Sequence, residues 1–129
     1  EAWGASRGES LHTQTFLGNP MACAAACAAL KELRELDAPK LARVKGEAFR
    51  KHLVAAGFSS EVIRGRGLML AVEVPNPLAA MSGLLQRGVI GLPCGEGAPP
   101  SFAMALVPPL IITDAQMRFV AEALRDACA

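Results

Sequence analysis

The chain has no tyrosine, a single tryptophan and two histidines, and aromatic residues make up only 5% of its 129 residues. It also lacks a charge excess, because 13 basic and 12 acidic side chains leave a formal net charge of +1 at pH 7. A protein that binds nucleic acid through its phosphates needs Lys and Arg concentrated on one surface. The balanced charge therefore argues against nucleic acid as a partner.

Long hydrophobic runs are missing as well. The two longest apolar stretches, 21–30 and 106–112, are broken by small residues or prolines and fall short of the roughly 20 residues that cross a bilayer. The sequence begins at Glu1 and shows no charged segment followed by an apolar one, as a secretory signal would. We expect a soluble, cytoplasmic chain with no membrane partner, cut from a longer polypeptide.

The four cysteines show none of the spacings of a disulfide framework. Cys23 and Cys27 lie one helical turn apart, but neither histidine stands at a spacing that would complete a metal site with them. We therefore expect four reduced cysteines, buried as structural thiols, and no metal ion.

The period of the apolar residues changes along the chain and predicts alternating helices and strands. Residues 1–20 are rich in glycine and polar groups and are expected to form a loop. A helix over 21–36 follows, with Asn19 as its N-cap and Pro20 at its first position. The other expected elements are a helix over 41–57, strands over 61–64 and 68–74, a helix over 77–88, strands over 89–92 and 102–107, and a last helix after residue 113.

Local motifs predict how some of these elements join. The glycine-rich segment 64–67 is expected to be the turn of a hairpin, and Thr113 with Gln116 has the spacing of a capping box. The order is helix, helix, hairpin, helix, strand, strand, helix. This order predicts an α+β domain with a small, mostly antiparallel sheet and helices packed on one face.

The residues before the first helix could hold an anion. Thr13, Gln14 and Thr15 supply two hydroxyls and an amide just ahead of a helix N-terminus, where free N–H groups and the helix dipole favour negative charge. On local physics alone, such residues more often serve as simple caps or turns.

Three segments together resemble one family. The string from His12 to Ala26, which contains Thr-Phe-Leu-Gly-Asn-Pro, is similar to a segment of the class III pyridoxal-phosphate aminotransferases, the group of ornithine, acetylornithine and 4-aminobutyrate aminotransferases. Residues 64–73 resemble the hairpin of that family's small domain, and residues 107–113 resemble its last strand and the turn into the C-terminal helix. The three segments occur in the family's order and span nearly the whole chain.

The resemblance implies an architecture and a reaction. Residues 1–20 would be an active-site loop of the large domain, and residues 21–129 the connecting helix and the small C-terminal domain of the aspartate-aminotransferase-like fold. The parent protein would transfer an amino group between an amine or amino acid and an oxo acid. It would use pyridoxal 5'-phosphate as cofactor and work as a homodimer.

The resemblance also implies site residues. Thr15 would reach the phosphate of the partner subunit's cofactor, and Gln14 beside it would either add a donor or displace a water. The lysine that forms the Schiff base would precede this chain, so no residue here is assigned a catalytic role and the isolated chain is expected to be inactive. Many relatives carry an arginine, bidentate to the substrate carboxylate, where this sequence has Ala105. Either another group binds that carboxylate or the substrate presents none there.

Two other functions stay open on the sequence. A free-standing α+β binding or regulatory module would explain the missing lysine but not the string around Thr15. A parent of the same fold could instead run another pyridoxal reaction, such as that of an aminomutase.

Overall fold

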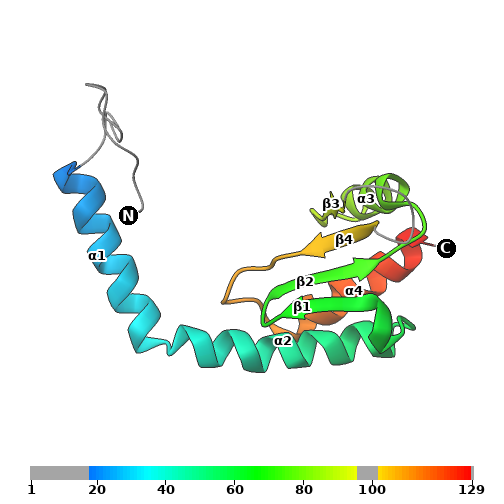
Figure 1. Cartoon of the computed structure of the whole chain (residues 1–129), viewed down its shortest axis with the longest axis horizontal. Helices are drawn as coiled ribbons and strands as arrows, with labels where there is room; N and C mark the ends of the chain where they lie inside the picture. The colour runs from blue at the N-terminus through cyan, green and yellow to red at the C-terminus, as the bar shows by residue number, and fades with distance from the viewer. Residues whose placement is uncertain (1–17, 96–101, 129) are drawn as a thin grey trace, which may run out of the picture. The chain divides into compact units, whose positions relative to one another are not determined.

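The computed structural model describes residues 18–95 and 102–128 (Figure 1). The elements follow in the order that the sequence predicts. They are α1 (Pro20–Glu35), α2 (Ala38–Ala55), the 3-10 turn η1 (Ser60–Val62), β1 (Ile63–Arg66), β2 (Met69–Glu73), α3 (Pro77–Gln86), β3 (Leu92–Cys94), β4 (Ala103–Leu106) and α4 (Asp114–Cys128). None of these helices combines the length and apolar character needed to cross a membrane.

The chain divides into two units, residues 1–36 and residues 37–129. The described part of the first unit is essentially α1, a helix with no buried residue. It begins as predicted, because the side-chain oxygen of Asn19 accepts a hydrogen bond from the N–H of Ala22 at 3.1 Å and Pro20 is the first helical residue. Pro20 has no N–H to leave unpaired, so it removes one of the unsatisfied donors at this end of the helix.

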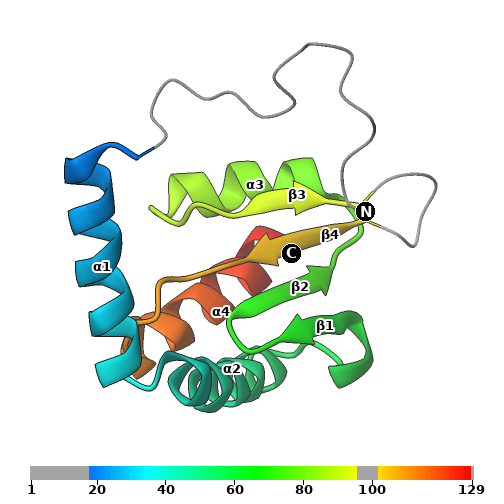
Figure 2. The same ribbon diagram turned by 60° about the vertical axis from the view of Figure 1, so that its left-hand side comes forward.

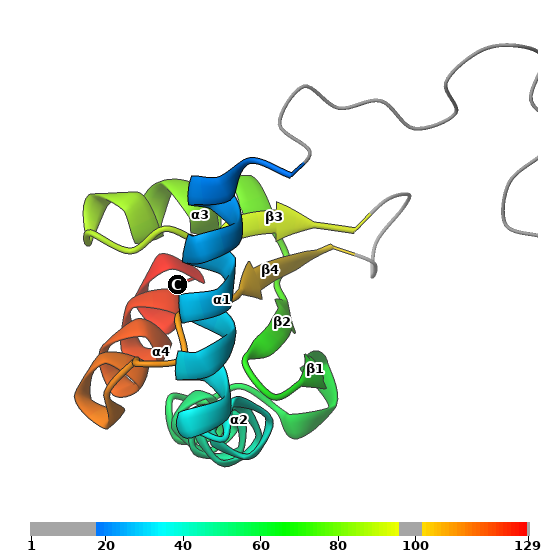
Figure 3. The ribbon, with the colours of Figure 1, turned by 90° about the vertical axis from the view of Figure 1, so that its left-hand side faces the viewer.

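The second unit is built on a four-stranded sheet in the order β1-β2-β4-β3, with each neighbouring pair antiparallel. Helices α2, α3 and α4 cover one face of this sheet (Figures 2 and 3). Apolar side chains from both layers meet between them and exclude water, which supplies most of the stability of such a domain. The largest fully buried ones are Phe49, Leu53, Leu70, Val72, Leu84, Met104 and Leu124. The prediction of a small antiparallel sheet with helices on one face is confirmed.

The strand boundaries differ from the prediction by one to three residues, and α2 begins at Ala38 rather than at residue 41. Two of the differences have a clear structural reason. Gly65 lies inside β1, opposite Leu70, and the turn falls at residues 67–68. Gly65 has φ +110°, and a Cβ there would collide with the carbonyl oxygen of Met69, so this glycine serves a close approach rather than the turn. Val89 is in no strand, because its N–H bonds the carbonyl of Leu84 as α3 ends, and β3 starts only at Leu92.

The cysteines are free, as predicted, but they are not buried. Cys23, Cys27 and Cys128 are exposed and Cys94 is half-buried. The expectation of buried thiols is wrong for α1 because no residue of that helix is buried. At the end of α4, partial burial raises the pKa of the Cys128 thiol above its ordinary value, because desolvation disfavours the thiolate.

Candidate functional site

The two residues predicted to contact a cofactor, Gln14 and Thr15, lie outside the described residues. The described chain starts three residues after Thr15, with Gly18 in the left-handed region at φ +74° and then Asn19 at the N-cap of α1. The first turn of α1 contains no acidic side chain. The positive end of the α1 dipole is therefore not offset by a carboxylate of its own first turn, which suits an anion held by the preceding residues.

The face of the sheet opposite the helices is the second candidate surface. Side chains alternate along a strand, so the partners of Ala105 on this open face follow from the strand register. Ala105 stands opposite Ala71 of β2 on one side and Leu92 of β3 on the other. The row Ala71-Ala105-Leu92 is uncharged, with the two alanines half-buried and Leu92 exposed. Ala105 thus occupies a short apolar strip across three strands.

On the same face the row continues at Arg64 of β1, which stands opposite Ala71 and forms an ion pair with a glutamate. Nε of Arg64 on β1 and Oε1 of Glu73 on β2 are 3.2 Å apart. The arginine side chain is 51% exposed, so solvent screens the pair and its contribution to stability is small. Arg64 is thus engaged within the sheet by Glu73.

At the hairpin end of the sheet there is an open groove of about 930 Å³. Three cations line it, Lys40 and Arg43 from α2 and Arg66 from β1, together with the single carboxylate of Asp37. Its apolar lining includes Leu68, Met69, Val107, Pro108 and Leu110. Sequence patterns do not predict this groove, because its residues come from three segments far apart along the chain. Arg66 belongs to the segment 64–67, which the sequence predicts as the hairpin turn.

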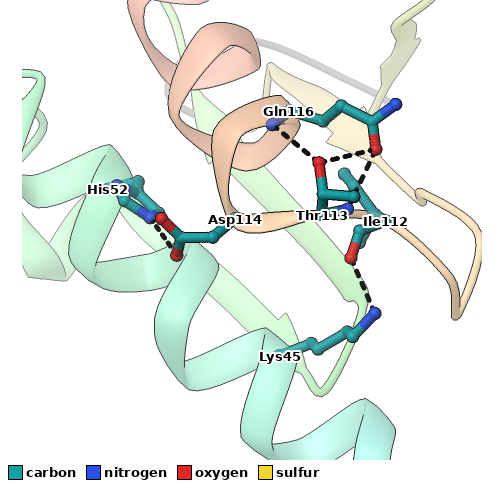
Figure 4. Close-up of polar contacts among 6 residues, drawn as sticks. All are labelled: Lys45, His52, Ile112, Thr113, Asp114 and Gln116. Atoms are coloured by element: carbon teal, nitrogen blue, oxygen red, sulfur yellow. Dashed lines mark hydrogen bonds and ion pairs between the residues drawn. The ribbon is translucent and has the colours of Figure 1, made fainter.

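Polar contacts fix the segment that follows β4 (Figure 4). Nζ of Lys45 donates to the carbonyl of Ile112 at 2.6 Å, and Nε2 of His52 lies 2.8 Å from Oδ1 of Asp114. Both side chains come from α2; Lys45 contacts the segment just before α4, and His52 contacts the first residue of that helix. They hold the turn after the Pro108-Pro109 pair in place and so support the end of the strand that carries Ala105.

Residues 18–95 and 102–128 contain no cluster of side chains that could bind a metal ion. No three side chains of the His, Cys, Asp or Glu type gather there closely enough to hold an ion. The side chain of His52 points toward Asp114 and contacts it (Figure 4). The described residues thus offer a helix N-terminus, an apolar strip and a cationic groove, and the carboxylates nearest to the strip and the groove are those of Glu73 and Asp37.

Comparison with known proteins gives one consistent family. The family model described as "Aminotransferase class-III" matches residues 3–128. The acetylornithine aminotransferase of Methanosarcina acetivorans is 33% identical over 125 residues, which are 96% of this chain and 31% of that protein. The acetylornithine aminotransferase of Corynebacterium efficiens is 39% identical over 119 residues, which are 91% of this chain and 28% of that protein.

Solved structures agree with these relatives. The ornithine aminotransferase from Toxoplasma gondii has a TM-score of 0.72 at 32% identity, over 95% of this chain and 30% of that one. An aminotransferase from Bacillus anthracis has a TM-score of 0.78 at 25% identity, over 95% of this chain and 32% of that one. The chain therefore spans less than a third of the length of the relatives it matches.

Proposed function

Because this chain belongs to the class III aminotransferase family, we propose that it is the C-terminal portion of an enzyme that moves an amino group between an amine or amino acid and an oxo acid. The observation that carries the proposal is the family match from residue 3 to residue 128. The family resemblance and the aspartate-aminotransferase-like fold predicted from three motifs are confirmed. A non-catalytic module of unrelated origin is not favoured, since such a module would not match aminotransferases over its whole length.

The chain's place in that enzyme is part of the proposal. Residues 1–20 are assigned to the large domain as an active-site loop, and residues 21–129 to the connecting helix and the small domain. The length is compatible with this assignment, because the chain matches only 28% to 32% of its longer relatives. The enzyme is proposed to be a homodimer, in which the loop of one subunit serves the cofactor of its partner.

The proposed cofactor is pyridoxal 5'-phosphate, and the residues of this chain that would hold it are Thr15 and Gln14. The cofactor supplies the electron sink for breaking a bond at the carbon that carries the amino group. The hydroxyl of Thr15 would donate to the phosphate, and the amide of Gln14 would add a second donor or displace a water. The uncompensated N-terminus of α1, four residues further on, supports an anion at this place.

The lysine that binds the cofactor is proposed to lie upstream of this chain. All four lysines of the sequence lie on α1 or α2, and two of them have partners there. Lys31 lies 3.8 Å from Glu35 on the same helix, and Lys45 donates to the carbonyl of Ile112. None of the four is proposed as catalytic, and the 129-residue chain by itself is expected to be inactive.

Ala105 leads to a proposal about the substrate. An alanine cannot bind a carboxylate, and its cross-strand neighbours Ala71 and Leu92 have no charge to do so either. We propose that the substrate end that faces this strip carries no carboxylate. The alternative, in which another residue of the longer protein binds a carboxylate there, makes the opposite prediction for substrate preference and is tested together with it.

The test is made on the full-length protein. We expect a visible absorbance from bound pyridoxal phosphate, and transfer of nitrogen from an amine donor to a separate oxo acid. If an isomer of the donor forms with no oxo acid required, the protein is an aminomutase and the transfer proposal is wrong. If neither cofactor absorbance nor transfer occurs with any of a panel of amines and oxo acids, the enzyme proposal fails. Borohydride reduction of the 129-residue chain with cofactor checks its lysines, and stoichiometric labelling of one of the four would contradict their exclusion.

A further inference from the structure

The outer edge of β1 is where this sheet could accept another strand. Among the strands of the described residues, the order places β1 at one end of the sheet, with β2 as its neighbour. An edge strand normally exposes unpaired N–H and C=O groups, and these are a template for pairing with a second chain. Whether the edge of β1 can pair with another strand therefore depends on whether these N–H and C=O groups already have hydrogen-bond partners.

Arg50 of α2 binds two of these groups. Its Nη1 donates to the carbonyl of Ile63 at 2.8 Å, and its Nη2 donates to the carbonyl of Gly65 at 2.6 Å. Residues two apart in a strand point their backbone groups to the same side, so both carbonyls face away from β2. One planar guanidinium with several donors can span two such carbonyls at once, which the single ammonium of a lysine does poorly.

A third outward backbone group of β1 is hydrogen-bonded within the turn that precedes the strand. The N–H of Ile63 donates to the carbonyl of Ser60, the first residue of η1. Ile63 and Gly65 are the two residues of β1 whose backbone faces outward, and together they have two N–H and two C=O groups. Within the described part of the chain, only the N–H of Gly65 is left to offer to a new strand.

The opposite edge is closed in a simpler way. β3 has three residues, and the middle one is Pro93, which has no N–H. A short strand centred on proline offers little to a partner strand. Arg50 is therefore the side chain on which the closure of the longer edge depends.

We propose that Arg50 blocks the β1 edge by occupying its two outward carbonyls, so that β1 does not pair with β1 of a second copy of this chain. A consequence is that other parts of the protein contact this domain through its faces and not by adding a strand to β1. Removing the guanidinium would free two carbonyls that are aligned for an antiparallel partner. A second copy brings the same freed edge, so the pairing would be symmetric.

The test compares Arg50→Met, Arg50→Lys and Arg43→Met in the full-length protein. Methionine keeps the length and apolar stem of arginine but donates no hydrogen bond, and lysine keeps the charge. Arg43 is an exposed arginine of the same helix that binds neither strand carbonyl, so Arg43→Met is the matched control. Sedimentation across a concentration series gives the association state of each variant, and a fluorescent peptide of residues 62–66 probes the edge directly.

We expect Arg50→Met to assemble beyond the wild-type state and to bind the peptide roughly tenfold or more tightly, since two carbonyls regain partners. A peptide methylated on its backbone nitrogens should not bind, and Arg43→Met should behave as wild type. Arg50→Lys should lie between, and it decides the question if Arg50→Met does not fold. If folded variants at Arg50 show wild-type assembly and wild-type peptide binding, Arg50 has only a packing role and the proposal is overturned.

Discussion

A Cβ atom on Gly46 of α2 would collide with the carbonyl oxygen of Gly67 in the turn between β1 and β2. Gly46 is buried, and helix and turn touch there backbone to backbone. This contact brings α2 close enough to the hairpin for Arg50, one turn further along the same helix, to reach the carbonyls of β1.

The first prediction concerns this approach. Gly46→Ala should destabilise the domain by about 1–3 kcal/mol, the usual cost of forcing an extra atom into a packed contact. The gain of up to about 1 kcal/mol from the better helix propensity of alanine is smaller and does not change the sign. Chemical denaturation of wild type and variant gives the difference directly. Glu47→Ala, at the exposed next position of α2, should stay within about 0.5 kcal/mol of wild type. An unchanged midpoint for Gly46→Ala would show that helix and turn separate easily.

A second prediction concerns the start of α4. Thr113 Oγ1 accepts from the N–H of Gln116 at 3.3 Å, and Gln116 Oε1 accepts from the N–H of Thr113 at 2.9 Å, so the predicted capping box is present (Figure 4). Thr113→Ala should cost about 1 kcal/mol, within the range of lost N-caps. Thermal unfolding measures the loss, with Ser82→Ala on the exposed side of α3 as the control. Equal losses for the two variants would mean that the box contributes nothing specific.

The starts of α1 and α4 were predictable because their signals are local, whereas α2 begins at Ala38 and not at the predicted residue 41. The start of each helix is indicated by two residues close together in sequence: Asn19 directly before Pro20 for α1, and Thr113 three residues before Gln116 for α4. The hairpin register was not predictable in the same way. Both Gly65 and Gly67 could form a turn as far as the sequence shows. Only the structure shows that Gly65 lies in the strand, where the backbone carbonyl of Met69 leaves no room for a Cβ atom.

Contacts between distant segments were also beyond the sequence pattern. Periodicity predicts which side of α2 faces the core, but not that Arg50 on that helix reaches the carbonyls of Ile63 and Gly65. The cationic groove at the hairpin has the same origin, since Lys40, Arg43 and Arg66 meet only when α2 packs beside the turn. The alanine at position 105 could be noted from the sequence, whereas its neighbours Ala71 and Leu92 required the strand register.

A third prediction tests the substrate proposal at Ala105. In the full-length enzyme, Ala105→Arg should raise kcat/KM for a substrate with a carboxylate at that end by roughly ten- to a hundredfold, because a charge-assisted hydrogen bond contributes about 1.5–3 kcal/mol. The preferred substrate should react more slowly, since the arginine intrudes into the apolar strip. Ala71→Arg places the same side chain one strand away on the same row and should give no such gain. If wild type already prefers the carboxylate-bearing substrate, another residue binds that group and the proposal for Ala105 is wrong.

The last prediction concerns Thr15 in the full-length enzyme. If its hydroxyl donates to the cofactor phosphate, Thr15→Val removes one charge-assisted hydrogen bond while nearly keeping the shape of the side chain. Such a bond contributes on the order of 1.5–3 kcal/mol, so the dissociation constant for pyridoxal phosphate should rise roughly ten- to a hundredfold. The melting temperature of the apoenzyme should hardly change, because Asn19 and not Thr15 supplies the N-cap of α1.

Thr13→Val is the matched control for that experiment, since it removes a hydroxyl two residues away that the proposal leaves without a role. Cofactor titration into the two apo variants and apo wild type, with a melting curve for each, separates binding from stability. A Thr15 that serves only the local turn would give the reverse pattern, with altered stability and unchanged cofactor affinity. Equal dissociation constants for wild type and Thr15→Val would therefore remove Thr15 from the phosphate site, while leaving the family membership of the chain untouched because that rests on the match over residues 3–128.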